Sequence, residues 1–174
     1  QLRPEELSRL RYDFELWARE DQLPPARAQG GGAWTVWLML GGRGAGKTRA
    51  GAEWVRAIAH APADAPPRIA LIGETLISAR SVMVEGVSGL LAVHPPEARP
   101  SYEPSKRQVT WASGAIAQLF SAEDPESLRG PQFSHAWCDE LCKWRDPDAA
   151  WAMLQLGLRL GEEPRQVVTT TPRP

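Results

Sequence analysis

The chain has 174 residues, which is enough for one domain with a substantial core, because folded domains of this size bury about 70% of the surface that the unfolded chain exposes. Its 20 Lys and Arg residues nearly balance its 21 Asp and Glu residues, and a net charge of −1 excludes a strongly basic protein that holds nucleic acid by overall charge alone. Its 2 cysteines are too few for a disulfide framework. No apolar run approaches the roughly 20 residues that cross a bilayer. We therefore expect a single soluble domain over residues 1–174 without membrane contact.

The N-terminal residues 1–20 are predicted to form an amphipathic helix. Acidic residues stand in its first turn behind Pro4, where they complement the positive end of the helix dipole. Its apolar side chains recur at three- and four-residue spacing, and we expect them to pack on the core: Leu7, Leu10, Phe14 and Trp17. Prolines and glycines then break regular structure over residues 21–33, so we interpret that stretch as a loop leading into a core at residues 34–174.

Residues 41–48 read Gly-Gly-Arg-Gly-Ala-Gly-Lys-Thr and follow an apolar run at residues 34–40 that is predicted to be a buried strand. A helical pattern with one apolar side continues from there to residue 60. A strand, a glycine-rich turn ending in Lys-Thr and a helix form a loop whose backbone N–H groups surround the phosphates of a nucleotide. The alternative is a glycine turn that precedes Lys-Thr by chance, and the flanking strand and helix argue against it.

Each residue type in this loop has a chemical reason to be there. Gly41, Gly44 and Gly46 permit positive φ angles and a close approach of the backbone to phosphate. Lys47 is placed to reach the β- and γ-phosphates, and the Thr48 hydroxyl is placed to bind Mg²⁺. We expect ATP and Mg²⁺ as the ligands, held by the loop residues Gly41, Gly42, Arg43, Gly44, Ala45, Gly46, Lys47 and Thr48.

Strand and helix patterns alternate along the rest of the chain. The predicted strands lie at residues 68–73, 107–111, 115–120, 133–138 and 166–170, and the second and third of these flank a tight turn at Ser113-Gly114. The predicted helices cover residues 75–93 and the stretch from Asp146 to Leu160, which Gly161 ends. Four prolines exclude regular structure from residues 94–105. We therefore expect an α/β fold with a mainly parallel central sheet, helices on both faces and an antiparallel hairpin.

Two carboxylates, Asp139 and Glu140, follow the strand at residues 133–138, at the edge of the sheet where doubly wound folds bind their ligands. Asp139 is predicted to hold Mg²⁺ directly or through water, and Glu140 to polarise a water for in-line attack on the γ-phosphorus. A solvated acidic turn is the alternative, but the phosphate loop in the same chain favours the catalytic interpretation. The long separation from Lys47 leaves room for an extra strand and helix. An extra strand and a catalytic glutamate are typical of the hydrolytic ASCE branch of the three-layer P-loop NTPase fold.

Four sequence runs resemble the large terminase subunit of tailed phages and of related gene transfer agents, in the order that this family shows. They are residues 41–54, 121–132 (Ser-Ala-Glu-Asp-Pro-Glu-Ser-Leu-Arg-Gly-Pro-Gln), 136–141 (Ala-Trp-Cys-Asp-Glu-Leu) and 169–174 (Thr-Thr-Thr-Pro-Arg-Pro). Their combination is far more specific than the phosphate loop alone. The resemblance covers only the ATPase half of the family.

Members of this family couple ATP hydrolysis to the pumping of double-stranded DNA into a preformed capsid. The resemblance implies a homo-oligomeric ring on the capsid portal, working with a small terminase subunit in the cytoplasm of a bacterial host. The family also carries a nuclease domain of ribonuclease H type after the ATPase. Because the chain ends at Pro174, we expect an ATPase domain alone that cannot cut DNA.

The resemblance implies roles for further residues. Arg43 matches a loop arginine that stabilises the γ-phosphate in cis, and Arg129 matches an arginine finger that is supplied to the neighbouring subunit; a solvent-facing arginine is the alternative for each. Gln22 resembles an upstream glutamine that contacts adenine, with an ordinary loop glutamine as the alternative. A coupling motif that relays the state of the γ-phosphate is matched by Thr169, Thr170 and Thr171, although threonine is also common in strands. The expected catalytic residues are Glu140, Lys47, Arg43 and Arg129.

Two other functions share parts of this pattern. A helicase or other DNA-remodelling ATPase of the same branch has the same loop, acids and threonines. A regulatory module that binds a nucleotide without hydrolysing it does not need the water-activating Glu140, so that residue speaks against it. A packaging motor moves along any sequence, so we expect contacts with DNA phosphates rather than with bases. The candidates, each of which is otherwise a solvated surface charge, are Arg80, Arg99, Lys106, Arg107, Lys143 and Arg145.

Overall fold

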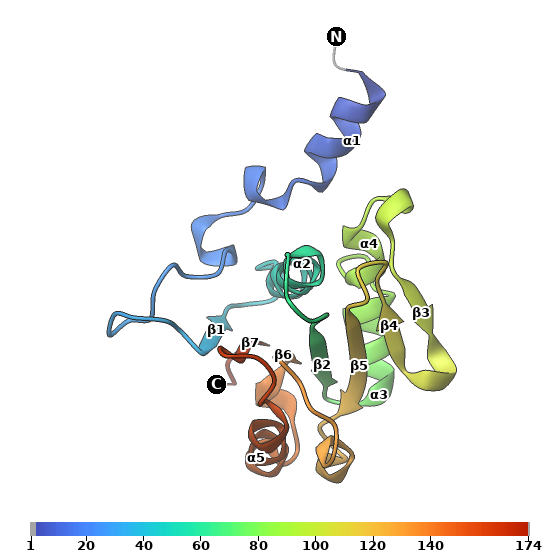
Figure 1. The fold of residues 1–174 in the computed structure, drawn as a ribbon. Coiled ribbons are helices and arrows are strands. Elements are labelled where there is room, and N and C mark those ends of the chain that lie inside the picture. The colour runs from blue at the N-terminus through green and yellow to red at the C-terminus, as the bar shows by residue number, and fades with distance from the viewer. Residues whose placement is uncertain (1–2, 174) are drawn as a thin grey trace.

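Seven strands form one sheet in the order β1-β7-β6-β2-β5-β4-β3 (Figure 1). The computed structural model describes residues 3–173. The strands are β1 (Val36–Leu40), β2 (Arg68–Gly73), β3 (Ser101–Glu103), β4 (Gln108–Thr110), β5 (Ile116–Ser121), β6 (His135–Asp139) and β7 (Arg165–Thr170). The first five strands of that order run parallel, and β4 and β3 continue the sheet antiparallel. The predicted mainly parallel sheet with an antiparallel hairpin is therefore confirmed.

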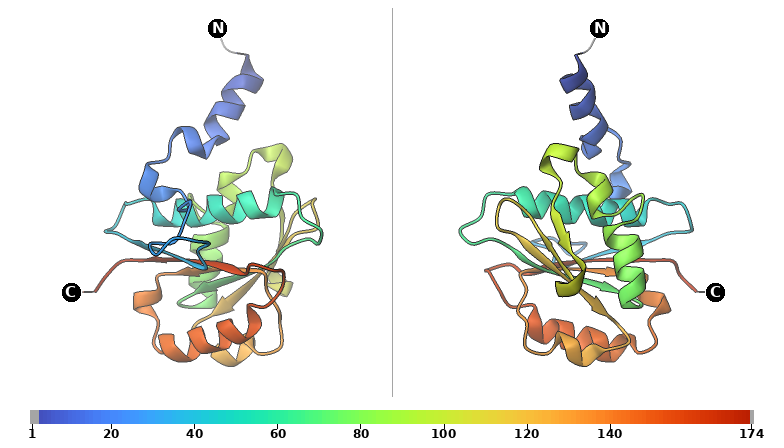
Figure 2. Two further views of the ribbon diagram at one scale, coloured as in Figure 1. Left: turned by 60° about the vertical axis from the view of Figure 1, so that its left-hand side comes forward. Right: turned by 90° about the vertical axis from the view of Figure 1, so that its right-hand side faces the viewer.

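Helices cover both faces of the sheet, which confirms the three-layer prediction (Figures 1 and 2). They are α1 (Pro4–Tyr12), α2 (Lys47–His60), α3 (Leu76–Ser78), a π-helix (Ala79–Val84), α4 (Leu90–Val93) and α5 (Pro147–Gly157). Short 3-10 turns lie at Phe14–Leu16, Glu20–Gln22 (η2), Pro96–Ala98, Pro104–Lys106, Pro125–Leu128 (η6) and Leu141–Lys143 (η7). Within residues 3–173, no helix combines the length and apolarity that a membrane span requires.

Two hydrophobic clusters, one on each face, hold the layers together. One buries Trp137, Leu71 and Val167 of the sheet under α2, the π-helix and α4, and the other buries Ile72 and Val168 under α5 and η6. The central strands β2, β6 and β7 are therefore buried on both faces, which the nearly continuous apolar sequence of β2 predicts for that strand.

The first strand differs from its prediction as a buried strand. β1 begins at Val36 and is an edge strand that pairs only with β7 among the described strands. Its residues alternate: Trp37 and Met39 are buried, whereas Val36, Leu38 and Leu40 are 42%, 54% and 60% exposed. An unbroken apolar sequence does not distinguish this half-exposed strand from one that is covered on both faces.

The N-terminal prediction is also corrected. The helix expected over residues 1–20 ends at Tyr12, and α1 stands away from the body of the protein (Figures 1 and 2). Leu7 and Trp17 are 53% and 67% exposed, so of the four predicted packing residues Phe14 is the one that packs against a core cluster. The apolar spacing continues across a break at Asp13, where the backbone is extended, and this break separates the two halves of the predicted apolar face. Residues 1 and 2 lie outside the described part.

Three boundaries in the middle and end of the chain were predicted wrongly. The helix predicted over residues 75–93 is interrupted between the π-helix and α4, where Gly86 and Gly89 approach backbone carbonyl groups. Residues 94–105 contain β3, which fits between flanking prolines and pairs with β4. α5 ends at Gly157 instead of Leu160, because the N–H of Leu160 donates to the Phe133 carbonyl group instead of continuing the helix.

A buried histidine lies beneath the hairpin. His94 is 0% exposed; its Nδ1 lies 2.7 Å from the Leu90 carbonyl oxygen, and the Trp111 indole N–H donates to its Nε2 at 2.9 Å. These contacts require a neutral ring with the proton on Nδ1, since a second proton on Nε2 would face the indole N–H. Burial accordingly lowers the pKa of His94 to about 4.

We predict that the contribution of His94 to the free energy of unfolding falls as the pH is lowered from about 6.5 to about 4. Because the unfolded chain takes up a proton on His94 that the folded protein does not, this residue's contribution is complete above pH 6.5 and is lost as the pH falls through its folded pKa, a change of up to about 3 kcal/mol. Urea unfolding across this range should show a flatter pH dependence for His94→Gln than for the wild type. Equal slopes would contradict the prediction.

Candidate nucleotide-binding site

The glycine-rich loop joins the end of β1 to the start of α2. Gly44 and Gly46 have φ angles of 76° and 79°, in the left-handed region where a side chain is disfavoured. Gly41 is not in that region, contrary to expectation; a Cβ there would lie 3.1 Å from the Cβ of Ala45, so close packing is the reason for this glycine. The loop leads directly into α2, whose first turn begins at Lys47.

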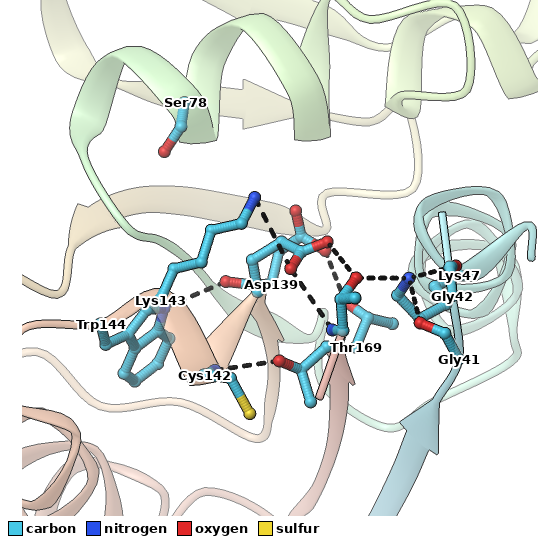
Figure 3. Close-up of polar contacts among 12 residues, drawn as sticks. Gly41, Gly42, Lys47, Ser78, Asp139, Cys142, Lys143, Trp144 and Thr169 are labelled. Carbon is cyan, nitrogen blue, oxygen red and sulfur yellow. Dashed lines mark hydrogen bonds and ion pairs between the residues drawn. The ribbon is translucent and has the colours of Figure 1, made fainter. Parts of the chain in front are cut away.

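The Lys47 side chain is buried at the centre of the site. Its ammonium group donates to the carbonyl oxygens of Gly41 at 2.9 Å and Gly42 at 3.0 Å, and to the hydroxyl of Thr171 at 3.0 Å (Figure 3). An ammonium group has three donors, so these contacts use all of them. A phosphate oxygen would have to replace at least one of these partners.

Thr171 connects the loop to Glu140. Its hydroxyl accepts from Lys47 and lies 3.3 Å from Oε1 of Glu140, to which it donates; its backbone N–H donates to Oε2 of Glu140 at 3.4 Å. The Lys143 ammonium lies 3.7 Å from the same Oε2. A continuous polar path therefore runs from the phosphate loop to the predicted water-activating carboxylate.

Asp139 lies beside this path in a buried environment. Its Oδ1 accepts a 2.6 Å hydrogen bond from Thr169, whose hydroxyl in turn accepts from the Trp137 indole N–H at 2.8 Å. Burial raises the pKa of Asp139 to about 6, the hydrogen bond from Thr169 lowers it, and the charge of Glu140 raises it further. The folded protein therefore stabilises the ionised form of Asp139 less well than water does.

The donor set fits a hard divalent cation such as Mg²⁺. Asp139 supplies a carboxylate whose charge a cation would offset, and Thr48, next to Lys47 in the first turn of α2, supplies a hydroxyl. Residues 3–173 hold no cluster of three or more His, Cys, Asp or Glu side chains suited to a metal. Mg²⁺ is commonly bound by one or two protein ligands and completed by substrate phosphates and water.

The turn after β6 is anchored on both sides. The indole N–H of Trp144 donates to the Asp139 carbonyl oxygen at 3.0 Å, and the N–H of Cys142 donates to the Thr170 hydroxyl at 2.9 Å. Glu140 itself has a φ of 51°, a left-handed conformation that is rare for a residue with a side chain. Strained residues of this kind persist where their surroundings hold them, which these hydrogen bonds do.

The other predicted site residues differ in how close they lie to this centre. Gln22 is buried, and its amide donates to the Ala45 carbonyl oxygen of the loop at 3.2 Å. Arg43 is exposed at the tip of the loop. Arg129 follows η6, has a 68% exposed side chain and pairs with Glu126 at 3.1 Å. The structure therefore brings Lys47 together with the acids and threonines, and it leaves the two arginines facing solvent.

Three residues with clear structural roles at the site were missed from the sequence. Lys143, considered only for DNA, lies against Glu140; Trp137, treated as core packing, also orients Thr169; and Arg19 donates to Ala45 of the phosphate loop at 3.0 Å. Lys143 stands three residues after Glu140, a spacing that brings side chains together in a single turn, and this signal was available. Nothing in the local sequence indicates the other two contacts.

Comparison with known proteins finds a matching family model. A family model described as "Terminase large subunit, T4likevirus-type, N-terminal" matches residues 38–174. No match is found among curated protein sequences.

Similar solved structures are large terminases. The large terminase of a thermophilic bacteriophage matches with a TM-score of 0.64 and 14% identity over 79% of this chain and 34% of its own. The bacteriophage HK97 large terminase has a TM-score of 0.58 and 18% identity over 98% of this chain and 33% of its own. The large terminase ATPase domain of Thermus phage P74-26 has a TM-score of 0.53 and 16% identity over 80% of this chain and 59% of its own. The present chain thus spans about one third of the length of the first two.

We predict that the Thr169 hydroxyl stabilises the fold through its two partners. Thr169→Val keeps the shape of the side chain but removes the hydrogen bond to Asp139 and leaves the buried Trp137 N–H without an acceptor, so it should lower the free energy of unfolding by about 2 to 3 kcal/mol. Thr169→Ser keeps the hydroxyl and should cost only about 1 kcal/mol. Urea unfolding at pH 7.5 measures both, and equal losses would show that the hydroxyl has no such role.

Proposed function

We propose that this chain, which belongs to the family of T4-like terminase large subunits and matches its N-terminal part, is an ATP-hydrolysing motor domain that drives double-stranded DNA into a capsid. The observation that carries the proposal is the polar path from Lys47 through Thr171 to Glu140. It joins a phosphate-binding loop to a carboxylate that a protein which only binds nucleotide would not need.

The site chemistry supports ATP as the substrate. The large terminase of a thermophilic bacteriophage, one of the similar structures, has been solved with ATP-gamma-S and with ADP. In the present chain the loop amides and Lys47 would hold the β- and γ-phosphates. Glu140 would accept a proton from a water aligned with the γ-phosphorus. Mg²⁺ held by Thr48 and Asp139 would supply neutralisation of the charge on the phosphate oxygens.

If the γ-phosphate displaces Lys47 from Thr171, phosphate binding changes the hydrogen bonds of Thr171. While Lys47 donates to Thr171, the Thr171 hydroxyl is directed to Glu140. When a phosphate takes that lysine donor, the hydroxyl loses one of its two partners, and the contacts of Glu140 change with it. We infer a coupling role for Thr171 from this geometry. Thr169 and Thr170 instead position Asp139 and the turn after it, which serves the same motif indirectly.

The remaining residue roles in this proposal come from the family. Arg43 would approach the γ-phosphate when the loop closes on it, and Arg129 would reach the site of a neighbouring subunit, for which its exposed position is suitable. Gln22 would contact the adenine base through the amide N–H that it does not donate to Ala45. A homo-oligomeric ring on a capsid portal, a small terminase subunit and assembly in the cytoplasm of a bacterial host complete the proposal.

The first test is Glu140→Gln. This change preserves the size of the side chain and one of its two acceptor oxygens but removes the base, so ATP binding should stay within about threefold of the wild type while turnover falls by about 100-fold or more. Binding is measured by titration calorimetry with ATP-gamma-S, and turnover by phosphate release. Lys47→Ala is the matched control, because it should lose binding as well. Near-normal turnover of Glu140→Gln would exclude Glu140 as the base.

The second test concerns Arg129. If this arginine acts on a neighbouring subunit, the dilute protein should hydrolyse ATP slowly, and the specific activity should rise with protein concentration as subunits associate. Arg129→Ala should remove that rise while leaving ATP-gamma-S binding unchanged. Glu126→Ala, which releases Arg129 from its surface ion pair, is the control and should retain the rise. A fast, concentration-independent rate that survives Arg129→Ala would contradict the trans role.

A further inference from the structure

Two side chains from the N-terminal segment converge on one carbonyl oxygen of the phosphate loop. The Arg19 guanidinium donates to the Ala45 carbonyl oxygen at 3.0 Å, and the Gln22 amide donates to the same oxygen at 3.2 Å. Both donors come from the short turn η2 and its flanking residue, 26 and 23 positions before Ala45. A carbonyl oxygen has two lone pairs, so this pair of donors satisfies it completely.

The two donors are themselves held in place. The Arg19 backbone N–H donates to Oε1 of Gln22 at 3.0 Å, which fixes the orientation of the Gln22 amide so that its nitrogen faces the loop. The Arg19 guanidinium also binds both carboxylate oxygens of Asp21, at 3.0 and 3.2 Å. Gln22 is only 8% exposed, and its amide nitrogen fills the space that a Cβ on Gly46 would need. The contact is therefore built into the packing of the loop.

The direction of the Ala45 carbonyl group determines the direction of the next N–H. A trans peptide is planar, with its C=O and N–H pointing in opposite directions, and residues 3–173 contain no cis peptide bond. Since the Ala45 oxygen points at Arg19 and Gln22, the Gly46 N–H points away from them. Gly46 has a positive φ and caps the start of α2, and backbone N–H groups in such a position form the concave sets of amides that bind anions. A flipped peptide would present the oxygen to the phosphate instead.

We propose that Arg19 and Gln22 are positioning residues that preset the Ala45–Gly46 peptide for phosphate binding. This inference rests on the proposed nucleotide-binding function and deepens it: the N-terminal segment organises the phosphate half of the site, whatever the base. It predicts that loss of the two donors weakens binding of any polyphosphate, including one that carries no nucleoside.

The test is calorimetric titration of the full chain with inorganic tripolyphosphate and with ADP, each with Mg²⁺. Gln22→Met keeps the size of the side chain without its donor. It should weaken tripolyphosphate binding about fivefold, as expected for one hydrogen bond of about 1 kcal/mol, and ADP binding by at least as much; adding Arg19→Met should bring the loss for tripolyphosphate to about 25-fold. Arg19→Lys keeps a cationic donor at a half-exposed position and should stay within about twofold of the wild type. Gln108→Met makes the same substitution on β4, away from the phosphate loop, and is the control that should leave binding of both ligands unchanged.

A second measurement does not depend on ligand affinity. Hydrogen exchange of the backbone amides of residues 44–48, in the ligand-free protein, should be faster in the double variant than in the wild type at unchanged thermal midpoint. If Gln22→Met weakens ADP binding but leaves tripolyphosphate binding unchanged, Gln22 acts on the base alone and the proposal is overturned. Unchanged exchange in the double variant overturns it as well. If instead Lys47→Ala binds tripolyphosphate as tightly as the wild type does, the proposed nucleotide-binding function itself fails. This failure is distinguishable from failure of the proposal on Arg19 and Gln22, because it is seen in a variant in which both residues are unchanged.

Discussion

The pairing register between β6 and β7 is the constraint on which the site depends. It places Thr169 opposite Asp139, so that Thr171 falls beside Glu140 just beyond the ends of both strands. β7 also pairs with β1, and this pairing brings Thr171 to Lys47 at the end of the phosphate loop. A slip of one residue would turn the threonine side chains to the opposite face and separate the lysine from the acid. The buried apolar residues of β7 on both faces oppose that slip.

The same register solves an electrostatic problem. Two neighbouring carboxylates repel one another, and burial disfavours the ionised form of Asp139. Lys47 and Lys143 lie near this pair, so the four charges sum to zero before any ligand binds. The hydroxyl groups of Thr169 and Thr171 each donate to one of the two carboxylates. The site can therefore exist without its ligand, while the raised pKa of Asp139 shows that it is not fully compensated and would gain from a cation.

The sequence was sufficient for those parts of the site that are local in the chain. The strand, glycine loop and lysine were predicted because they are contiguous, and Asp139 and Glu140 because a strand ends immediately before them. The contacts that orient these groups were not predicted, since Trp137 with Thr169 and Arg19 with Ala45 depend on register and packing between distant segments. β1 was misjudged for a related reason: whether an apolar strand is covered on both faces depends on its neighbours. The N-terminal helix was overextended because a backbone break at Asp13 leaves the apolar spacing unchanged.

Two glycines show how the fold and the phosphate loop constrain each other. Gly51 on α2 faces the ring of Trp137, and a Cβ at that position would overlap the ring, so the sheet sets how closely α2 can approach. Trp137 is the same residue that orients Thr169 and, through it, Asp139. Gly46, at the other end of the first turn, has no space for a Cβ because of Gln22. Lys47 and Thr48 lie between these two contacts, so their placement relative to Asp139 follows from rigid packing on both sides and not from the loop sequence alone.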